Sequence, residues 1–119
     1  MRIVVTSTGS ALESAVDPRF GRAANFILID GRTGEHESVE NRATDASQGA
    51  GIGAARRVAE LGAEYVLTGH CGPKAFRTLT AAGVKVIVGV AGTVSEAYER
   101  FLSGELSAAE QADVDGHWS

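Results

Sequence analysis

Short apolar runs separated by glycine-rich turns dominate the first part of the chain. Residues 3–6 are β-branched, residues 25–30 are mostly apolar, and residues 35–40 are more polar. These patterns predict three strands, with the polar one at an exposed edge of a sheet. Residues 31–34 carry the glycine, threonine and arginine of a turn, so the first third of the chain is expected to form an antiparallel meander.

The remaining apolar positions recur at helical spacing, interrupted by two strand-like runs. Glycines follow each helical pattern, as expected where a helix ends in a left-handed residue. Pro73 suits a first helical position, and Thr93 with Glu96 fits a capping box. The expected elements are a helix from Gly49 to Gly62, a strand at 65–68, a helix from Pro73 to Gly83, a strand at 84–90 and a helix between Thr93 and Gly104.

The resulting order, β-β-β-α-β-α-β-α, predicts an α/β fold. Two strand–helix–strand crossovers imply parallel pairing in the second half, and their right-handedness places helices on both faces of the sheet. We therefore expect a three-layer sandwich around a mixed five-stranded sheet. The 119 residues suffice for one domain, with the α/β domain that carries the binding site in residues 1–104 and a polar C-terminal tail in residues 105–119.

Composition excludes several classes of function. The net charge of −4 and the presence of only two lysines, Lys74 and Lys85, leave no basic stripe for nucleic acid. A single cysteine excludes an internal disulfide. No apolar run approaches the length of a signal peptide or a membrane span. We therefore expect a cytoplasmic monomer that binds neither nucleic acid nor membrane.

Unusual residues concentrate in the loops expected at the carboxyl ends of the parallel strands, where open α/β sheets bind ligands. These loops are residues 7–22, 69–73 and 89–93, and segment 41–53 could join them. In 69–73, two glycines allow close approach of a ligand, and a helix N-terminus favours the thiolate of Cys71. The alternative, equally supported by sequence, is a tight turn with Cys71 as a small core residue.

Two further segments contain candidate anion-binding groups. Residues 17–22 place Arg19 and Arg22 around Phe20, which suits an anion clamp over an apolar floor. Taken alone, these residues favour the alternative, a turn with a buried phenylalanine and two solvated arginines. Residues 49–53 have the wrong glycine spacing for a dinucleotide loop, but a glycine-rich helix start can receive an anion.

Ligand counting restricts what kind of metal centre is possible. A structural zinc or an iron–sulfur cluster typically needs four cysteine or histidine ligands, whereas this region offers Cys71 and the adjacent His70. A monomer of this chain cannot build such a centre. A bound metal centre would have to bring most of its ligands with it, as sulfides, and the protein would supply N–H donors, arginines and apolar contacts.

The residues from Asp17 to Phe26, the helix start at 49–52, and residues 69–76 with 83–86 resemble the dinitrogenase iron-molybdenum cofactor biosynthesis family over roughly the first hundred residues. The resemblance implies a ribonuclease H-like fold and the binding, storage or delivery of iron–molybdenum cofactor or its precursors. Within this family, the chain looks most like a short stand-alone member that holds a mixed molybdenum–copper sulfide cluster without covalent attachment. Some relatives have a histidine where this chain has Arg19, which leaves the identity of the cofactor open.

The resemblance implies that the loops at 17–22, 49–53 and 69–73 line the cofactor. The expected cofactor-binding residues are Arg19, Phe20, Gly21, Arg22, Gly49, Gly51, Ile52, Gly53, Gly69, His70, Cys71 and Gly72, with His70 and Cys71 the candidate metal ligands.

The function predicted from these observations is non-catalytic carriage of a preformed, anionic metal–sulfur cluster. The cluster would be of the molybdenum–copper sulfide or the iron–molybdenum cofactor type, and a cofactor-donating or cofactor-accepting protein is the expected partner. The alternative is a redox or transfer enzyme with Cys71 as nucleophile, although no orienting carboxylate can be assigned to it.

Overall fold

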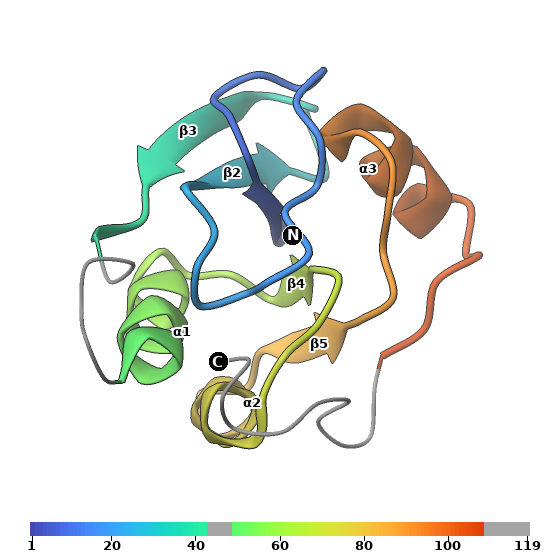
Figure 1. Ribbon diagram of the computed structural model, residues 1–119. Helices are drawn as coiled ribbons and strands as arrows, with labels where there is room; N and C mark the ends of the chain where they lie inside the picture. The colour runs from blue at the N-terminus through green and yellow to red at the C-terminus, as the bar shows by residue number, and fades with distance from the viewer. Residues whose placement is uncertain (43–48, 109–119) are drawn as a thin grey trace.

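The computed structural model describes residues 1–42 and 49–108. Its elements follow the predicted order, and most of their boundaries agree with the sequence pattern within one or two residues (Figure 1). The elements are β1 (Arg2–Ser7), β2 (Asn25–Asp30), β3 (His36–Glu40), α1 (Ala50–Glu60), β4 (Tyr65–Leu67), α2 (Pro73–Ala81), β5 (Lys85–Ile87) and α3 (Val94–Leu102).

The five strands form one mixed sheet in the order β3-β2-β1-β4-β5. β1, β2 and β3 pair antiparallel, and β1, β4 and β5 pair parallel, so the predicted mixed sheet is confirmed. β3 lies at an edge, as its polar pattern predicts, and four of its five residues are exposed. The finer assignment to a ribonuclease H-like fold stays a prediction.

Alternate residues of each buried strand point to opposite faces of the sheet, and helices cover both of these faces. Val4, Val66 and Val86 pack with residues of α1 and α2 in one apolar cluster. Val5, Leu67 and Ile87 pack with residues of α3 in a second cluster. Figure 1 shows α1 and α2 on one side of the sheet and α3 on the other. The three-layer arrangement is therefore confirmed.

β5 is shorter than the apolar run that predicted it. The run at 84–90 suggested a strand throughout, but β5 covers Lys85–Ile87 only. Gly89 adopts a left-handed backbone with φ of 75°, which no strand can continue through. Its N–H donates instead to the carbonyl of Gly69, 2.8 Å away, so the end of the apolar run becomes part of a loop.

The chain beyond α3 is described only as far as residue 108, and Leu106 there packs against the second apolar cluster. Residues 109–119, most of the predicted polar tail, lie outside the described residues. Within the described part of the chain, every helix is too short or too polar to cross a bilayer.

Candidate functional site

The three loops singled out by sequence converge at one edge of the sheet. β1, β4 and β5 are parallel, so their carboxyl ends share an edge, and the loops that follow are hydrogen-bonded to one another. The Val16 N–H donates to the Gly92 carbonyl at 2.9 Å, and the Gly89 N–H donates to the Gly69 carbonyl at 2.8 Å. The loops after β1, β4 and β5 therefore form one continuous surface, as the parallel topology predicts.

Segments 17–20 and 69–71 approach each other most closely. Arg19 and His70 form a parallel bridge between them, and the Phe20 N–H donates to the His70 carbonyl at 3.1 Å. A Cβ atom at Gly69 would lie 2.6 Å from the Pro18 Cα and 2.7 Å from its carbonyl oxygen. Because backbone atoms cannot give way as a flexible side chain can, this approach requires glycine at position 69.

A buried hydroxyl pair anchors these segments to the strand ends, and sequence reasoning missed it. The Thr6 Oγ1 lies 2.8 Å from the Asp17 carbonyl oxygen and 2.9 Å from the Thr68 Oγ1, and both threonines are fully buried. The Asp17 carboxylate in turn accepts from the Arg19 N–H at 3.0 Å. The sequence signal for this pair was a threonine at the end of each apolar run: Thr6 follows residues 3–5, and Thr68 follows residues 65–67.

Asn41 is a second residue that the sequence did not reveal. It is buried, and its side-chain amide donates to the Ala23 carbonyl at 2.8 Å and to the Gly21 carbonyl at 3.3 Å. Its own N–H donates to the Ala24 carbonyl at 3.0 Å. Asn41 therefore fixes the far end of segment 17–24, as expected for a buried amide whose donors must be paired.

Two helix N-termini lie at the same edge of the sheet. α2 begins directly after the loop that follows β4. α1 ends at the opposite edge, where the Arg2 side chain donates to the Leu61 carbonyl at 3.0 Å, so its N-terminus lies toward the loops. The two helices pack against each other. Positive helix-dipole ends from two neighbouring helices are therefore present at this edge.

The capping of these two helices differs from that of α3. α1 and α2 have glycine N-caps, Gly49 and Gly72, with no side-chain cap and no acidic residue in the first turn. α3 instead has the predicted capping box, in which Thr93 and Glu96 satisfy each other's backbone N–H groups. The first N–H groups of α1 and α2 therefore have no side-chain acceptor from their own caps, which leaves them suited to an external anion.

The predicted site residues differ widely in exposure. Arg19 and Gly49 are exposed, and Arg22, Ile52, Gly53 and His70 are half-buried. The buried members are Phe20, Gly21, Gly51, Gly69, Cys71 and Gly72. The accessible side chains of this set are thus those of Arg19, Arg22 and His70 together with the apolar Ile52, and the glycines contribute backbone.

Phe20 and Cys71 belong to the core, where both are 0% exposed in the cluster that contains Ala54 of α1 and Ala75 of α2. The Phe20 ring stacks on Phe26 with 6.1 Å between centroids. These placements favour the interpretation of Cys71 as a small core residue and of Phe20 as a buried anchor rather than an exposed floor. Among residues 1–42 and 49–108, no group of three or more His, Cys, Asp or Glu is arranged to hold a metal ion.

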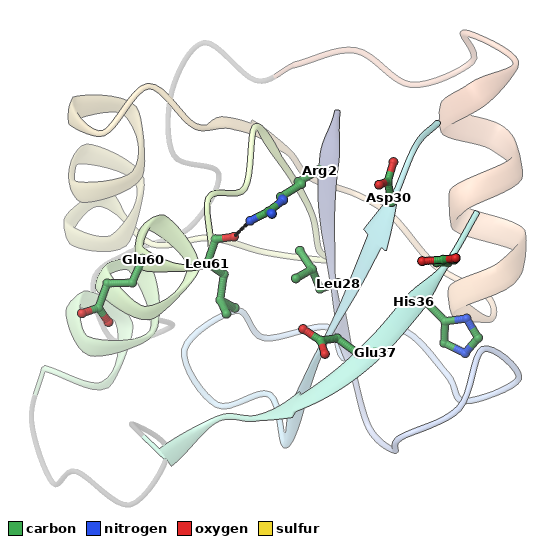
Figure 2. Close-up of a pocket in the computed structure, with 8 residues that line it drawn as sticks. Arg2, Leu28, Asp30, His36, Glu37, Glu60 and Leu61 are labelled. Atoms are coloured by element: carbon green, nitrogen blue, oxygen red, sulfur yellow. Dashed lines mark hydrogen bonds between the residues drawn. The ribbon is translucent and has the colours of Figure 1, made fainter. Parts of the chain in front are cut away.

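Two open hollows lie outside the loops that follow β1, β4 and β5. One, of about 440 Å³, lies between the end of α1 and strands β2 and β3 (Figure 2), and four carboxylates line it against a single arginine, Arg2. Figure 2 shows Arg2 reaching to Leu61, with Leu28 beside them. The pKa of Asp30 here is lowered, chiefly because its carboxylate accepts from the Arg32 N–H. This acidic hollow does not suit an anion.

The other hollow, of about 500 Å³, lies between α1 and the end of β3, and its lining includes Gly53 and Asn41. It touches the predicted set only through Gly53. Its charged lining mixes Arg42 and Arg57 with Glu40 and Glu60, so its net charge favours neither sign.

Solved structures of similar proteins share this fold along nearly the whole chain. The orange protein of Desulfovibrio gigas, solved in its apo form, is 46% identical, with a TM-score of 0.93 over 95% of this chain and 96% of that chain. A Thermotoga protein of the DUF35 family, described as a candidate NifB protein, is 37% identical, with a TM-score of 0.83 over 97% of this chain and 98% of that chain.

A protein of uncharacterised function from Methanocaldococcus jannaschii is 29% identical over 98 residues, which cover 80% of this chain and 83% of that protein. The dinitrogenase iron-molybdenum cofactor family matches residues 1–104, the whole of the sheet and its helices. That match confirms the resemblance seen in the loop motifs. The chain belongs to the dinitrogenase iron-molybdenum cofactor family.

Proposed function

We propose that this chain binds and carries a preformed, anionic, molybdenum-containing metal–sulfur cluster, and does so without catalysis. The observation that carries the proposal is the pair of glycine-capped helix N-termini, those of α1 and α2, at the sheet edge where Arg19 and Arg22 lie. Family membership supports a molybdenum- or iron-containing cofactor as the ligand.

The electrostatics of this edge favour an anion of more than one charge. Each helix N-terminus carries about half a positive charge and stabilises a nearby anion by roughly 0.3–1 kcal/mol. Two such termini and two arginine guanidiniums outweigh the Asp17 carboxylate at this edge, in a chain whose net charge is −4. Thiomolybdate-type clusters, whose sulfides accept hydrogen bonds and carry several negative charges, match this arrangement.

The burial of Cys71 supports a cluster that supplies its own ligands. A thiol that is 0% exposed among core side chains cannot reach an incoming metal without local opening of segment 69–72. The same burial weighs against Cys71 as the nucleophile of an enzyme, because a substrate has no access to it. The cluster would therefore be of the molybdenum–copper sulfide or iron–molybdenum cofactor type, held without covalent attachment.

Carriage implies a second protein that donates or accepts the cluster. A site held by helix ends and by the side chains of Arg19 and Arg22 suits such exchange, because its contacts are individually weak and no bond to the chain must break. We propose a cofactor-donating or cofactor-accepting protein as the partner.

Reconstitution tests the proposal directly. Metal-free protein mixed with tetrathiomolybdate and Cu(I) should yield a coloured species that elutes with the protein on gel filtration, with molybdenum and sulfide in fixed ratio to the chain. Colour that elutes entirely with the small molecules would contradict the proposal.

Arginine variants test the position of the site. Arg19→Gln and Arg22→Gln should each weaken binding by roughly two- to fivefold, since a charge contact near the surface contributes up to about 1 kcal/mol. Arg32→Gln is the matched control, because Arg32 is an exposed arginine in the turn after β2, at the opposite edge of the sheet. Equal losses in all three variants would indicate a general charge effect and not a site at this edge.

A further inference from the structure

The two fully buried threonines at the ends of β1 and β4 stand apart from the rest of the core. Both strands are otherwise apolar in their interior, and a buried hydroxyl stabilises a fold only when it is hydrogen-bonded. Thr6 is the last residue but one of β1, whose buried run ends at Ser7, and Thr68 directly follows β4. Each therefore lies where its strand gives way to a loop of the candidate site.

The hydrogen-bonding roles in this pair follow from the number of protons available. The Asp17 carbonyl can only accept, so the Thr6 hydroxyl, 2.8 Å away, must donate its single proton to it. The contact of 2.9 Å between the two hydroxyls is then made by Thr68 donating to Thr6. The chain of donors thus runs from Thr68 through Thr6 to the Asp17 backbone.

Asp17 transmits this anchoring to the cationic part of the site. Its N–H donates to the Thr6 carbonyl at 2.9 Å, so Asp17 is attached to Thr6 through both its N–H and its carbonyl. Its carboxylate accepts from the Arg19 N–H at 3.0 Å, and Arg19 bridges to His70. Asp17 is itself 9% exposed, and its anchoring is therefore shielded from competing water.

Thr68 attaches the same anchor to the other two loops. Its N–H donates to the Ile87 carbonyl at 3.0 Å, and its carbonyl accepts from the Val90 N–H at 3.1 Å. Thr68 is therefore joined to β5 and the loop after it through its backbone, and its hydroxyl joins it to Thr6 of β1.

We propose that Thr6 and Thr68 are positioning residues of the cofactor site: their hydroxyls set the place of Arg19 and His70 through the Asp17 backbone. This inference rests on the proposed function for its binding consequence. Its structural consequence, the placement of Arg19 and His70, can be measured without any ligand.

The variants are chosen so that shape is kept while hydroxyls are removed. Thr6→Val leaves the Asp17 carbonyl and the Thr68 hydroxyl without their partner, so it should weaken tetrathiomolybdate–Cu(I) binding by roughly three- to tenfold. Thr68→Val should have a smaller effect, since Thr6 still donates to Asp17. Thr6→Ser, which keeps the hydroxyl, should restore wild-type binding. The double valine variant should bind no more weakly than Thr6→Val, because the two hydroxyls act as one unit.

Ile29→Val is the control for a general loss of stability. Ile29 is buried in the second apolar cluster, and it pairs with Ile3 near the opposite edge of the sheet. This variant should lose stability without weakening binding or shifting the Arg19 and His70 amide resonances in the ¹⁵N NMR spectrum of metal-free protein. Thr6→Val should shift both resonances.

The outcomes separate this inference from the proposed function. Failure of the wild type to bind the cluster would overturn the proposed function, while the amide shifts would still decide the positioning role. Unchanged Arg19 and His70 resonances in Thr6→Val, or binding losses in Thr6→Ser equal to those in Thr6→Val, would overturn the positioning role.

Discussion

Gly69→Ala is the substitution whose effect follows most directly from the structure. The added Cβ would meet backbone atoms of Pro18 at 2.6 Å and 2.7 Å. Ordinary carbon–carbon contacts lie at about 3.5–4.0 Å, so segments 17–20 and 69–71 would have to separate by roughly 0.9 Å. The hydrogen bond between the Phe20 N–H and the His70 carbonyl, now 3.1 Å, would then be broken.

The energetic cost can be assembled from these two changes. Forcing apart well-packed atoms costs about 1–3 kcal/mol, and a buried N–H left without its partner costs about 1–3 kcal/mol. Replacing glycine by alanine recovers about 0.4–1 kcal/mol by restricting the unfolded chain. We therefore expect a net loss of about 1–5 kcal/mol, and a loss of about 3 kcal/mol lowers the Tm of a domain of this size by roughly 10 °C.

Urea and thermal unfolding of Gly69→Ala beside Gly31→Ala provide the measurement. Gly31 also has an ordinary φ, but the atom nearest to its added Cβ is the flexible end of Met1, at 3.0 Å. Gly31→Ala should therefore change stability by less than about 1 kcal/mol. Equal stability of the two variants would refute the reasoning, because it would show that the close approach of the two loops is not required.

Three further outcomes are expected. Thr93→Ala should cost about 1 kcal/mol in urea unfolding by removing the α3 cap, with cluster binding unchanged because α1 and α2 supply the proposed site. The Glu96 pKa is lowered from 4.5, chiefly by the Thr93 backbone N–H, so its contribution to stability is present above pH 4.5 and is lost as pH falls through the lower folded pKa. The stability difference between wild type and Glu96→Gln should therefore shrink on acidification, and a constant difference would contradict this. Cys71→Ala should lose about 1 kcal/mol through a small cavity yet retain binding within about twofold, and complete loss of binding would instead identify Cys71 as a ligand.

Much of the architecture could be predicted because the periodicity of the apolar residues agrees with the residues that begin and end each helix. The alternating and helical patterns, the capping box at Thr93 and the glycines at 62, 83 and 104 define their elements locally. The length of β5 could not be predicted in this way. An apolar run continues past Ile87, and only the left-handed Gly89 and its bond to Gly69 end the strand.

The sequence predicted which loops form the candidate site, but it did not predict the hydrogen bonds and the packing that hold those loops together. Parallel topology suffices to bring segments 17–22 and 69–73 to one edge, so their convergence could be foreseen. The roles of Thr6, Thr68 and Asn41 depend on partners that are distant in sequence, and no local pattern reveals such partners. Sequence also left open whether Cys71 faces a ligand or the core, because a glycine-flanked cysteine suits both; packing with Ala75 decides its place.

The central claim is that a molybdenum–sulfur cluster binds at the edge formed by the two glycine-capped helices and Arg19. Amide NMR of the ¹⁵N-labelled chain, titrated with tetrathiomolybdate and Cu(I), tests it most directly because both species are diamagnetic. We predict shifts at residues 19–22, 50–52 and 74–75, with residues 30–37 of the acidic hollow unchanged. Shifts confined to residues 30–37, or no shifts at any concentration, would contradict the claim.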